Sequence, residues 1–209
     1  MNVNGVNMKG SRAQREGYHH GNLRAALLEA ALAVLLESGP DALSLRRAAE
    51  RAGVSSSAPY NHFRNKEALL TELAADRRAR AGEAFRAALA AADTPEAKLR
   101  ALGRAYVDYA LAHRAEFRLM FGGALRTGAA GNALEAPILE LFRGPLRDAG
   151  LRGTDLDDAA VTAWSLVHGL AQLVSDGPLE GLAGDPEGLS RLAERVTLGL
   201  GELNGAAWG

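Results

Sequence analysis

Apolar residues recur along most of this chain with the three-to-four residue spacing of amphipathic helices. The first such stripe begins near the end of a polar N-terminal stretch, and its members are Leu23, Ala26, Leu27, Ala30, Ala31, Val34 and Leu35. Gly39 and Pro40 follow directly and are typical of a helix end. We therefore expect the first helix between residue 23 and this glycine.

A second, shorter helix is predicted directly afterwards. Ser44 is a favourable N-cap, and Gly53 suits the left-handed residue that stops a helix. The buried face between them consists of small and medium apolar residues, namely Leu45, Ala48, Ala49 and Ala52. Because alanines leave room, another helix is able to approach this face closely.

The ten residues after the glycine, "VSSSAPYNHF", combine turn-forming serines and a proline with polar aromatic residues. We expect Ser55, Ser56 or Ser57 to cap a short third helix with Pro59 in its first turn, because the missing N–H costs nothing there. This helix is predicted to end near His62 or Phe63. Ordinary bundle helices joined by a serine-rich connection are the alternative, which explains the serines but not the polar aromatic residues.

The rest of the chain also has helical patterns. We expect a long helix over 66–92, a helix started by "DTPE" at 93–96 with an acidic N-cap, and a short helix "EFRLMFGG" ending at Gly122. A glycine- and alanine-rich loop at 123–136, a helix over 137–147 and a break at 150–155 follow, and two apolar helices over 158–175 and 186–203 complete the chain. The fold class is thus all-α, with about nine helices in all.

Composition supports this fold class and excludes several kinds of chemistry. Aromatic residues make up only 5% of the 209 residues, and β-branched residues are scarce. The absence of cysteine excludes disulfides, thiolate catalysis and cysteine-ligated metals. The longest apolar run, 30–36, is too short to span a membrane, and residues 1–17 are polar. We expect a cytoplasmic protein with a disordered N-terminal arm over 1–17.

Charge is distributed unevenly along the chain. Residues 1–66 contain nine Lys or Arg and five Asp or Glu, a net charge of +4, whereas the remaining residues contain 15 and 20, a net charge of −5. A basic N-terminal third on an acidic body favours a nucleic-acid-binding head. A simple solvated surface is the alternative, since the difference is small.

Two helices joined by a glycine turn, the second short and polar, are typical of the helix-turn-helix. Serine, asparagine and tyrosine side chains donate to phosphates or read base edges, and a helix N-terminus offers its N–H groups to a phosphate. The candidate DNA-binding residues are Arg46, Ser55, Ser56, Ser57, Tyr60, Asn61, His62 and Lys66.

Residues 23–70 resemble the DNA-binding domain of the tetracycline-repressor (TetR) family of transcriptional regulators, through the first helix, the "RAGVS" turn and the residues from Tyr60 to Leu70. The resemblance implies that Tyr60 and His62 contact the DNA backbone and that Lys66 pairs with a phosphate. It also implies that four side chains face the bases, those of Arg46, Ser56, Ser57 and Asn61. The family more often has threonine and leucine in place of Ala58 and Pro59.

The resemblance further implies a division into the arm, a helix-turn-helix domain over 18–66, and an effector-binding and dimerisation domain over 67–209. It predicts a repressor that binds a palindromic operator in double-stranded DNA as a homodimer and is released by a small-molecule effector. "WSLVHG" at 164–169 also resembles a C-terminal signature of the WHG-type branch.

The last two predicted helices have an apolar pattern that indicates association with another molecule. The segment 158–175 is apolar on nearly all sides, so it must be buried from more than one direction. A two-fold dimer is the commonest solution, and it places two recognition helices about 34 Å apart; a fully internal core is the alternative. The candidate interface residues are Trp164, Leu170, Leu192, Val196 and Leu200.

Aromatic, methionine and histidine residues of the body gather on three predicted helices, as an apolar ligand site with polar anchors requires. The candidate effector-binding residues are Tyr106, Tyr109, His113, Phe117, Met120, Phe121, Trp164 and His168. Plain core packing is the alternative.

No enzymatic site is expected. His19, His20, His62, His113 and His168 have no partners at metal-binding spacing, and no phosphate loop or Ser, His, Asp set is present, so neither a metal nor a cofactor is predicted. Two rival classes are a helical adaptor that binds only protein, which salt-dependent DNA binding would exclude, and a small helical enzyme, which turnover of a bound ligand would reveal.

Overall fold

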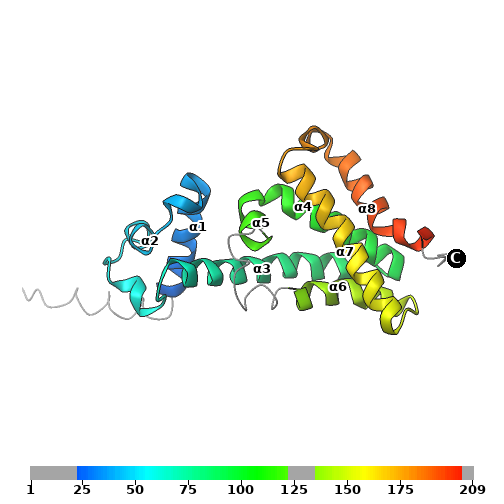
Figure 1. Ribbon diagram of the computed structural model, residues 1–209, viewed down its shortest axis with the longest axis horizontal. Helices are drawn as coiled ribbons and strands as arrows, with labels where there is room; N and C mark the ends of the chain where they lie inside the picture. The colour runs from blue at the N-terminus through cyan, green and yellow to red at the C-terminus, as the bar shows by residue number, and fades with distance from the viewer. Residues whose placement is uncertain (1–22, 122–134, 204–209) are drawn as a thin grey trace, which may run out of the picture. The chain divides into compact units, whose positions relative to one another are not determined.

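The computed structural model describes residues 23–121 and 135–203, and every regular element in these ranges is a helix (Figure 1). In chain order the elements are α1 (Leu23–Ala42), α2 (Leu45–Ala52), the 3-10 helix η1 (Ala58–Asn61), α3 (Lys66–Ala90), α4 (Pro95–Ala112), α5 (Arg114–Phe121), α6 (Glu135–Asp148), α7 (Gly153–Ser175), the 3-10 helix η4 (Glu180–Gly184) and α8 (Pro186–Leu203). The all-α prediction is confirmed. The nine helices expected from the sequence correspond to the eight α-helices and η1. The predicted arm over 1–17 lies outside the described residues, and so do residues 123–134 of the loop predicted over 123–136. The last two residues of that predicted loop belong to α6, which begins at Glu135.

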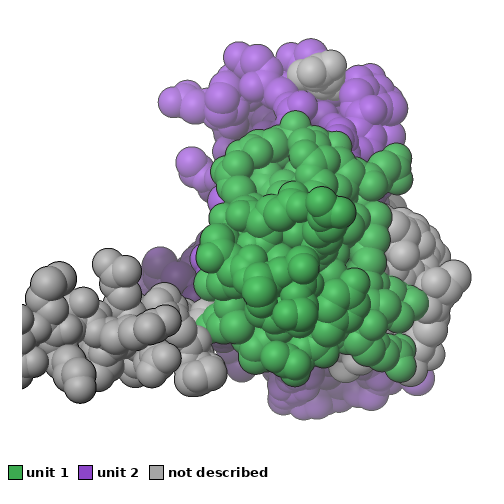
Figure 2. All heavy atoms as spheres, turned by 90° about the vertical axis from the view of Figure 1, so that its left-hand side faces the viewer, with its two compact units in different colours: residues 1–73 green, residues 74–209 purple. Residues whose placement is uncertain are grey.

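The chain forms two compact units, residues 1–73 and residues 74–209, which we call the head unit and the body unit (Figure 2). The division falls inside α3, so the first turns of this helix belong to the head unit and its remainder to the body unit. None of the described helices is long and apolar enough to cross a membrane.

The head unit is built on the packing of α1 against α2. Its core contains Leu27, Ala31 and Ala48, and each of them is fully buried. The small alanine faces of α2 allow this close packing, as the sequence predicted. Gly39 has a φ of 77° and interrupts the helical backbone of α1 at the predicted end.

The body unit is built around α4, which packs against α6, α7 and α8 (Figure 1). α4 begins at the predicted "DTPE" stretch, but Thr94 is its N-cap and accepts a hydrogen bond from the Ala97 N–H at 3.1 Å. The expected acidic cap by Asp93 is therefore wrong. α4 approaches α8 closely at Gly103, where a Cβ atom would lie 1.9 Å from the Thr197 hydroxyl oxygen.

Candidate nucleic-acid interface and ligand cavity

The turn after α2 is fixed by caps at both helix ends. The Ser44 hydroxyl accepts a hydrogen bond from the Arg47 N–H at 3.1 Å, which starts α2 as predicted. Gly53 takes the left-handed conformation with a φ of 70°, and its N–H and that of Val54 donate to carbonyls of the last turn. A side chain other than glycine would be strained here, so this glycine determines where the chain leaves α2.

The segment after the turn folds as a 3-10 helix instead of an α-helix. The N–H groups of His62 and Phe63 both donate to the Pro59 carbonyl at 2.9 Å, and the Tyr60 N–H donates to the Ser57 carbonyl at 3.2 Å. The predicted serine cap is absent, since the Ser57 side chain makes no capping bond. Pro59 has no N–H to offer, and the Tyr60 N–H is already bonded, which leaves no donor for the serine hydroxyl.

The side chains of the "SSS" and "YN" stretches point to solvent, whereas those of their apolar neighbours are buried. Ser55, Ser56, Ser57 and Asn61 are exposed, and the Tyr60 side chain is 62% exposed. A large aromatic side chain with this exposure has no core function. Pro59 and Phe63 are buried and anchor the segment from below. The head unit therefore presents a row of hydroxyl, amide and phenol groups on a rigid support.

Two cations among the predicted DNA-binding residues, Lys66 and Arg46, already donate hydrogen bonds to oxygen atoms of the chain. The Lys66 ammonium donates to the Pro40 carbonyl at 2.7 Å, and the Arg46 Nε donates to the Glu50 carboxylate at 2.9 Å. An ammonium has three donors, so Lys66 keeps two for a phosphate. His62 is half-buried, and its ring lies beside that of Phe63.

Sequence analysis did not single out two further polar residues of this segment. Arg64 is exposed, directly between Phe63 and the start of α3. The Asn65 side chain accepts from the Ala68 N–H at 2.9 Å and so caps α3. Asparagine is a favourable N-cap residue, so Asn65 could have been used in the sequence to predict where α3 starts.

In the body unit, five of the predicted effector-binding residues form one aromatic cluster, comprising Tyr106, Phe117, Phe121, Trp164 and His168. The Tyr106 hydroxyl lies at its centre, 2.8 Å from His168 Nδ1, and accepts from the Trp164 indole N–H at 3.2 Å. Burial raises the pKa of Tyr106 and lowers the pKa of His168, because each loses the solvation of its charged form.

Tyr109 and His113 form a separate group with two charged side chains. The Tyr109 ring lies 4.5 Å from the His113 ring, centroid to centroid, and His113 Nδ1 lies 3.3 Å from the Glu116 carboxylate. The same carboxylate lies 3.9 Å from the Arg77 guanidinium. Burial, together with the nearby Glu116 charge, raises the pKa of Tyr109 to about 12. Within the described residues, no three His, Asp or Glu side chains gather as a metal site would require.

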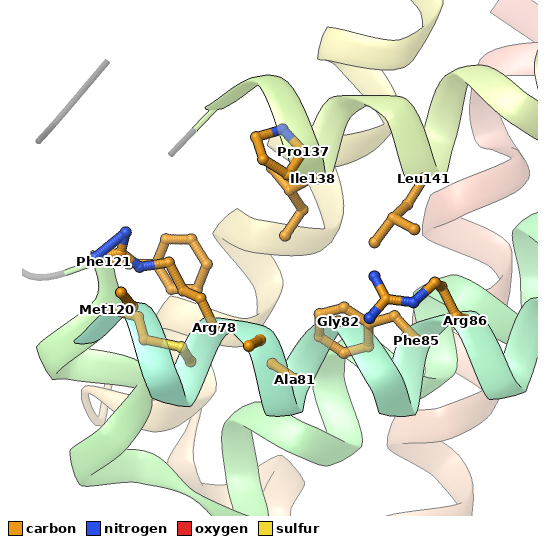
Figure 3. Close-up of a pocket in the computed structure, with 12 residues that line it drawn as sticks. Arg78, Ala81, Gly82, Phe85, Arg86, Met120, Phe121, Pro137, Ile138 and Leu141 are labelled. Carbon is orange, nitrogen blue, oxygen red and sulfur yellow. The ribbon is translucent and has the colours of Figure 1, made fainter. Parts of the chain in front are cut away.

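A cavity of about 310 Å³ lies in the body unit between α3, α5 and α6 (Figure 3). Its apolar lining includes Ala81 and Phe85 from α3, Met120 and Phe121 from α5, and Pro137, Ile138 and Leu141 from α6. Two arginines of α3, Arg78 and Arg86, also line it. Met120 and Phe121 belong to the predicted effector-binding set. The other six predicted residues do not line this cavity, although the Phe85 ring stacks on Tyr106 at 5.3 Å.

The predicted dimer residues lie on α7 and α8. Leu170 is only 7% exposed and belongs to the body core, whereas Trp164, Leu192 and Val196 are half-buried. The side chain of Leu200 lies outside the described residues. Sequence analysis missed three exposed apolar residues of α7, Val161, Leu166 and Leu173, which are 39–46% exposed. The sequence showed that this helix is apolar on nearly all sides, but not which of its residues the rest of the chain leaves exposed.

These features define a class of protein: a helical DNA-binding regulator with a helix-turn-helix head and a separate body. Comparison with known families agrees. Residues 27–73 match the family described as bacterial regulatory proteins, tetR family, and residues 99–197 match the tetracyclin repressor-like C-terminal domain. The chain belongs to the TetR family of transcriptional regulators, which bind DNA. The matched descriptions name no branch, so the WHG-type assignment stays a prediction.

Individual relatives are similar over different lengths of the chain. The chain is 54% identical over 48 residues to the Escherichia coli tetracycline repressor protein class A from transposon 1721, and the match covers 23% of this chain and 22% of that repressor. A protein of unknown function from Rhodococcus sp. RHA1 has a similar structure, with a TM-score of 0.70 and 34% identity over 87% of this chain and 96% of that one. SmeT, the repressor of the Stenotrophomonas maltophilia multidrug efflux pump SmeDEF, shares the fold with a TM-score of 0.64 and 24% identity, over 85% of this chain and 89% of that one.

Proposed function

We propose that this protein is a repressor that binds a palindromic operator as a homodimer and is released by a small-molecule effector. The observation that carries the proposal is the row of exposed polar side chains after the Gly53 turn, held by buried Pro59 and Phe63. Exposed polar side chains of this kind are able to enter a DNA groove, and they have no function in the core. Repression is the usual mode of the family.

In this proposal Tyr60, His62 and Lys66 contact the phosphate backbone, whereas Ser56, Ser57, Asn61 and Arg46 face the bases. The four predicted base-facing residues differ in how free their side chains are to reach DNA. Ser56, Ser57 and Asn61 are exposed, but Arg46 must first leave Glu50. We therefore expect the serines and the asparagine to determine sequence preference more than Arg46 does.

The test is salt-dependent DNA binding by the full chain. An operator is first selected from a random duplex library, and its affinity is then followed by fluorescence anisotropy at several salt concentrations. Lys66→Ala removes one phosphate contact, so the slope of log affinity against log salt should fall by about 0.9 on every sequence. Lys98→Ala is the matched control, because Lys98 pairs with Asp148 in the body unit. Equal slopes for wild type and Lys66→Ala would refute the assignment.

The same assay distinguishes residues that contact bases from residues that contact phosphates. Ser57→Ala and Asn61→Ala should change which bases are selected, with a loss of about 1–3 kcal/mol at the affected position and little change in salt slope. A protein that acts only as an adaptor would give no salt-dependent binding at all. That result would favour the rival class over the regulator.

For the homodimer we propose that the interface includes the exposed apolar residues of α7, Val161, Leu166 and Leu173, together with Trp164, Leu192 and Val196. Gly169 also belongs to α7, and a Cβ atom there would meet nothing within 4 Å, so a second helix has room to approach at this position. Leu166→Glu and Leu173→Glu should give monomers, since each buries an unpaired charge at the interface. Leu36→Glu, at a 56% exposed position of α1, is the matched control. A wild-type monomer at micromolar concentration in analytical ultracentrifugation would contradict the model.

Effector release is proposed to act through α3. The head-unit part of α3 contributes Leu69 and Leu73, and the body-unit part contributes Ala81 and Phe85, all of them buried. Because one helix carries residues of both units, a ligand in the body is able to shift the head between two arrangements. The ligand must bind the DNA-incompetent arrangement more tightly. A reporter gene behind the selected operator should be silent without ligand and expressed with it.

A further inference from the structure

Most of the described arginines of the body unit form an ion pair with an acidic side chain. Arg143 lies 2.7 Å from the Asp157 carboxylate, and Arg118 lies 3.1 Å from the Asp176 carboxylate. The two arginines that line the α3 cavity are different, because no carboxylate of the described residues pairs with Arg78 or Arg86. Arg86 is exposed to solvent, but Arg78 is half-buried, and a partly buried cation without a carboxylate partner calls for an anion from outside the chain.

Arg78 shows this need most clearly. Its Nε atom is buried and has no hydrogen-bond partner among the described residues. Burial also lowers the pKa of its guanidinium, which means that the site penalises the charge it carries. An unsatisfied buried donor on a charged group costs free energy that a ligand oxygen would recover.

Arg86 lies two helical turns further along the same helix, about 12 Å by the rise of an α-helix. Its guanidinium rests on Gly82, where a Cβ atom would lie 3.2 Å from it, so the absent side chain makes room for it. Figure 3 shows Ile138 and Leu141 of α6 pointing toward α3, the helix that carries both arginines. The cavity thus has cationic groups on one wall and an apolar opposite wall.

The described lining of the cavity contains no Asp or Glu. A neighbouring hollow shares Arg86 and Leu141 and is lined by Glu140 and Asp148. Glu140 accepts from Arg147 at 3.1 Å, and Asp148 pairs with Lys98 at the same distance. Both acids are therefore already engaged by cations other than the two arginines of the cavity wall.

We propose that the α3 cavity binds a small monocarboxylate with an apolar body, whose carboxylate pairs with Arg78 or Arg86 and whose body packs on Phe85, Phe121 and Ile138. A guanidinium presents two parallel N–H donors, which match the two oxygens of a carboxylate. The cavity volume of about 310 Å³ lies at the lower end of the roughly 300–1,000 Å³ typical of small-molecule sites. This inference rests on the proposed function, because it names the chemical class of the effector.

The experiment compares three probes with one chain and different head groups: decanoate, decanol and decylamine, each below its micelle concentration. Their binding to the purified full chain is measured by isothermal titration calorimetry without DNA. Decanoate should bind about tenfold more tightly than decanol, and decylamine should bind most weakly, because only the carboxylate gains charge-assisted hydrogen bonds. Equal affinity for decanoate and decanol, or a preference for decylamine, would overturn the inference.

Arginine variants then show which side chain binds the carboxylate of the ligand. Arg78→Met and Arg86→Met keep an apolar stem but remove the guanidinium, and at least one of them should abolish the preference for decanoate while leaving decanol binding unchanged. Arg195→Met is the matched control on an exposed arginine of α8. Retention of the full decanoate preference in both cavity variants would place the carboxylate elsewhere and refute the site.

A second readout separates this inference from the proposed function. Decanoate is added to the preformed complex with operator DNA, and release is followed by anisotropy. Tight, arginine-dependent binding without release supports the site and contradicts effector control. Release by decanol or decylamine but not by decanoate supports effector control and refutes the carboxylate class.

Discussion

The close crossing of α4 and α8 allows a test of the body fold with a magnitude derived from the structure. Gly103 lies in α4, and a Cβ atom there would lie 1.9 Å from the Thr197 hydroxyl oxygen and 2.9 Å from the Thr197 Cβ. Thr197 is 2% exposed, and its hydroxyl donates to the Ala193 carbonyl at 2.7 Å. The Thr197 side chain is therefore enclosed and has no free space into which it could move. Gly103→Ala must separate the two helices or break this hydrogen bond.

Overpacking of this kind costs about 1–3 kcal/mol, whereas replacing a helical glycine by alanine returns up to about 1 kcal/mol. We expect Gly103→Ala to lower the free energy of unfolding by roughly 1–2 kcal/mol net, since the contacts with the Thr197 side chain are closer than those that real Cβ atoms make. For a chain of this size, each kcal/mol lowers Tm by about 2–4 °C.

The assay is thermal and urea unfolding followed by circular dichroism. Gly144→Ala is the matched control, because a Cβ atom at that position of α6 meets nothing within 4 Å. Thr197→Ala in the Gly103→Ala background removes the nearest oxygen, so part of the lost stability should return. If Gly103→Ala is as stable as the wild type, α4 and α8 do not cross as described.

Three further predictions concern caps and buried polar groups. Ser44→Ala should lower the unfolding free energy by about 1 kcal/mol in urea titrations, whereas Ser57→Ala should not, because only Ser44 accepts a capping hydrogen bond. Tyr106→Phe should cost about 1–3 kcal/mol in the same titrations, because the His168 and Trp164 nitrogens lose their buried partner. Since burial lowers the pKa of His168, the unfolded chain binds more protons below about pH 6.5, and stability falls as the pH drops toward the folded-state pKa. Titrations at pH 7.5 and 5.5 should show a smaller fall for His168→Gln, and equal falls would contradict the burial of a neutral imidazole.

Helix positions were predictable from the sequence because their determinants are local. The stripe that begins at Leu23, the Ser44 cap and the left-handed Gly53 all act within a few residues. The prediction failed where two local rules compete. At Pro59 the missing N–H removed the donor that a serine cap requires, so the segment became a 3-10 helix. At Thr94 a hydroxyl displaced the neighbouring acid as the cap.

The cavity was harder to predict because it depends on which helices meet. Met120 and Phe121 were expected from their chemistry, but the α3 wall was not. In the sequence, Arg78 and Arg86 look like members of a solvated face on a charged helix, as most such arginines are. Only the packing of α6 opposite them turns this face into a cavity wall. The same limit applies to α7, where burial alone distinguishes Leu170 from exposed Leu166.

The charge of the head unit leads to a conclusion about how DNA binding is divided along the chain. Residues 23–73 contain six Lys or Arg and six Asp or Glu, so the helices of the head are neutral overall. Two of these cations, Arg46 and Arg51, are also engaged by Glu50 and Glu37. The surplus lies in residues 1–22, which contain three Lys or Arg and one acid. Because non-specific affinity depends on the number of cations that reach phosphates, we infer that residues 1–22 supply much of the salt-dependent affinity. The neutral helices are then left to supply sequence preference through Ser57 and Asn61.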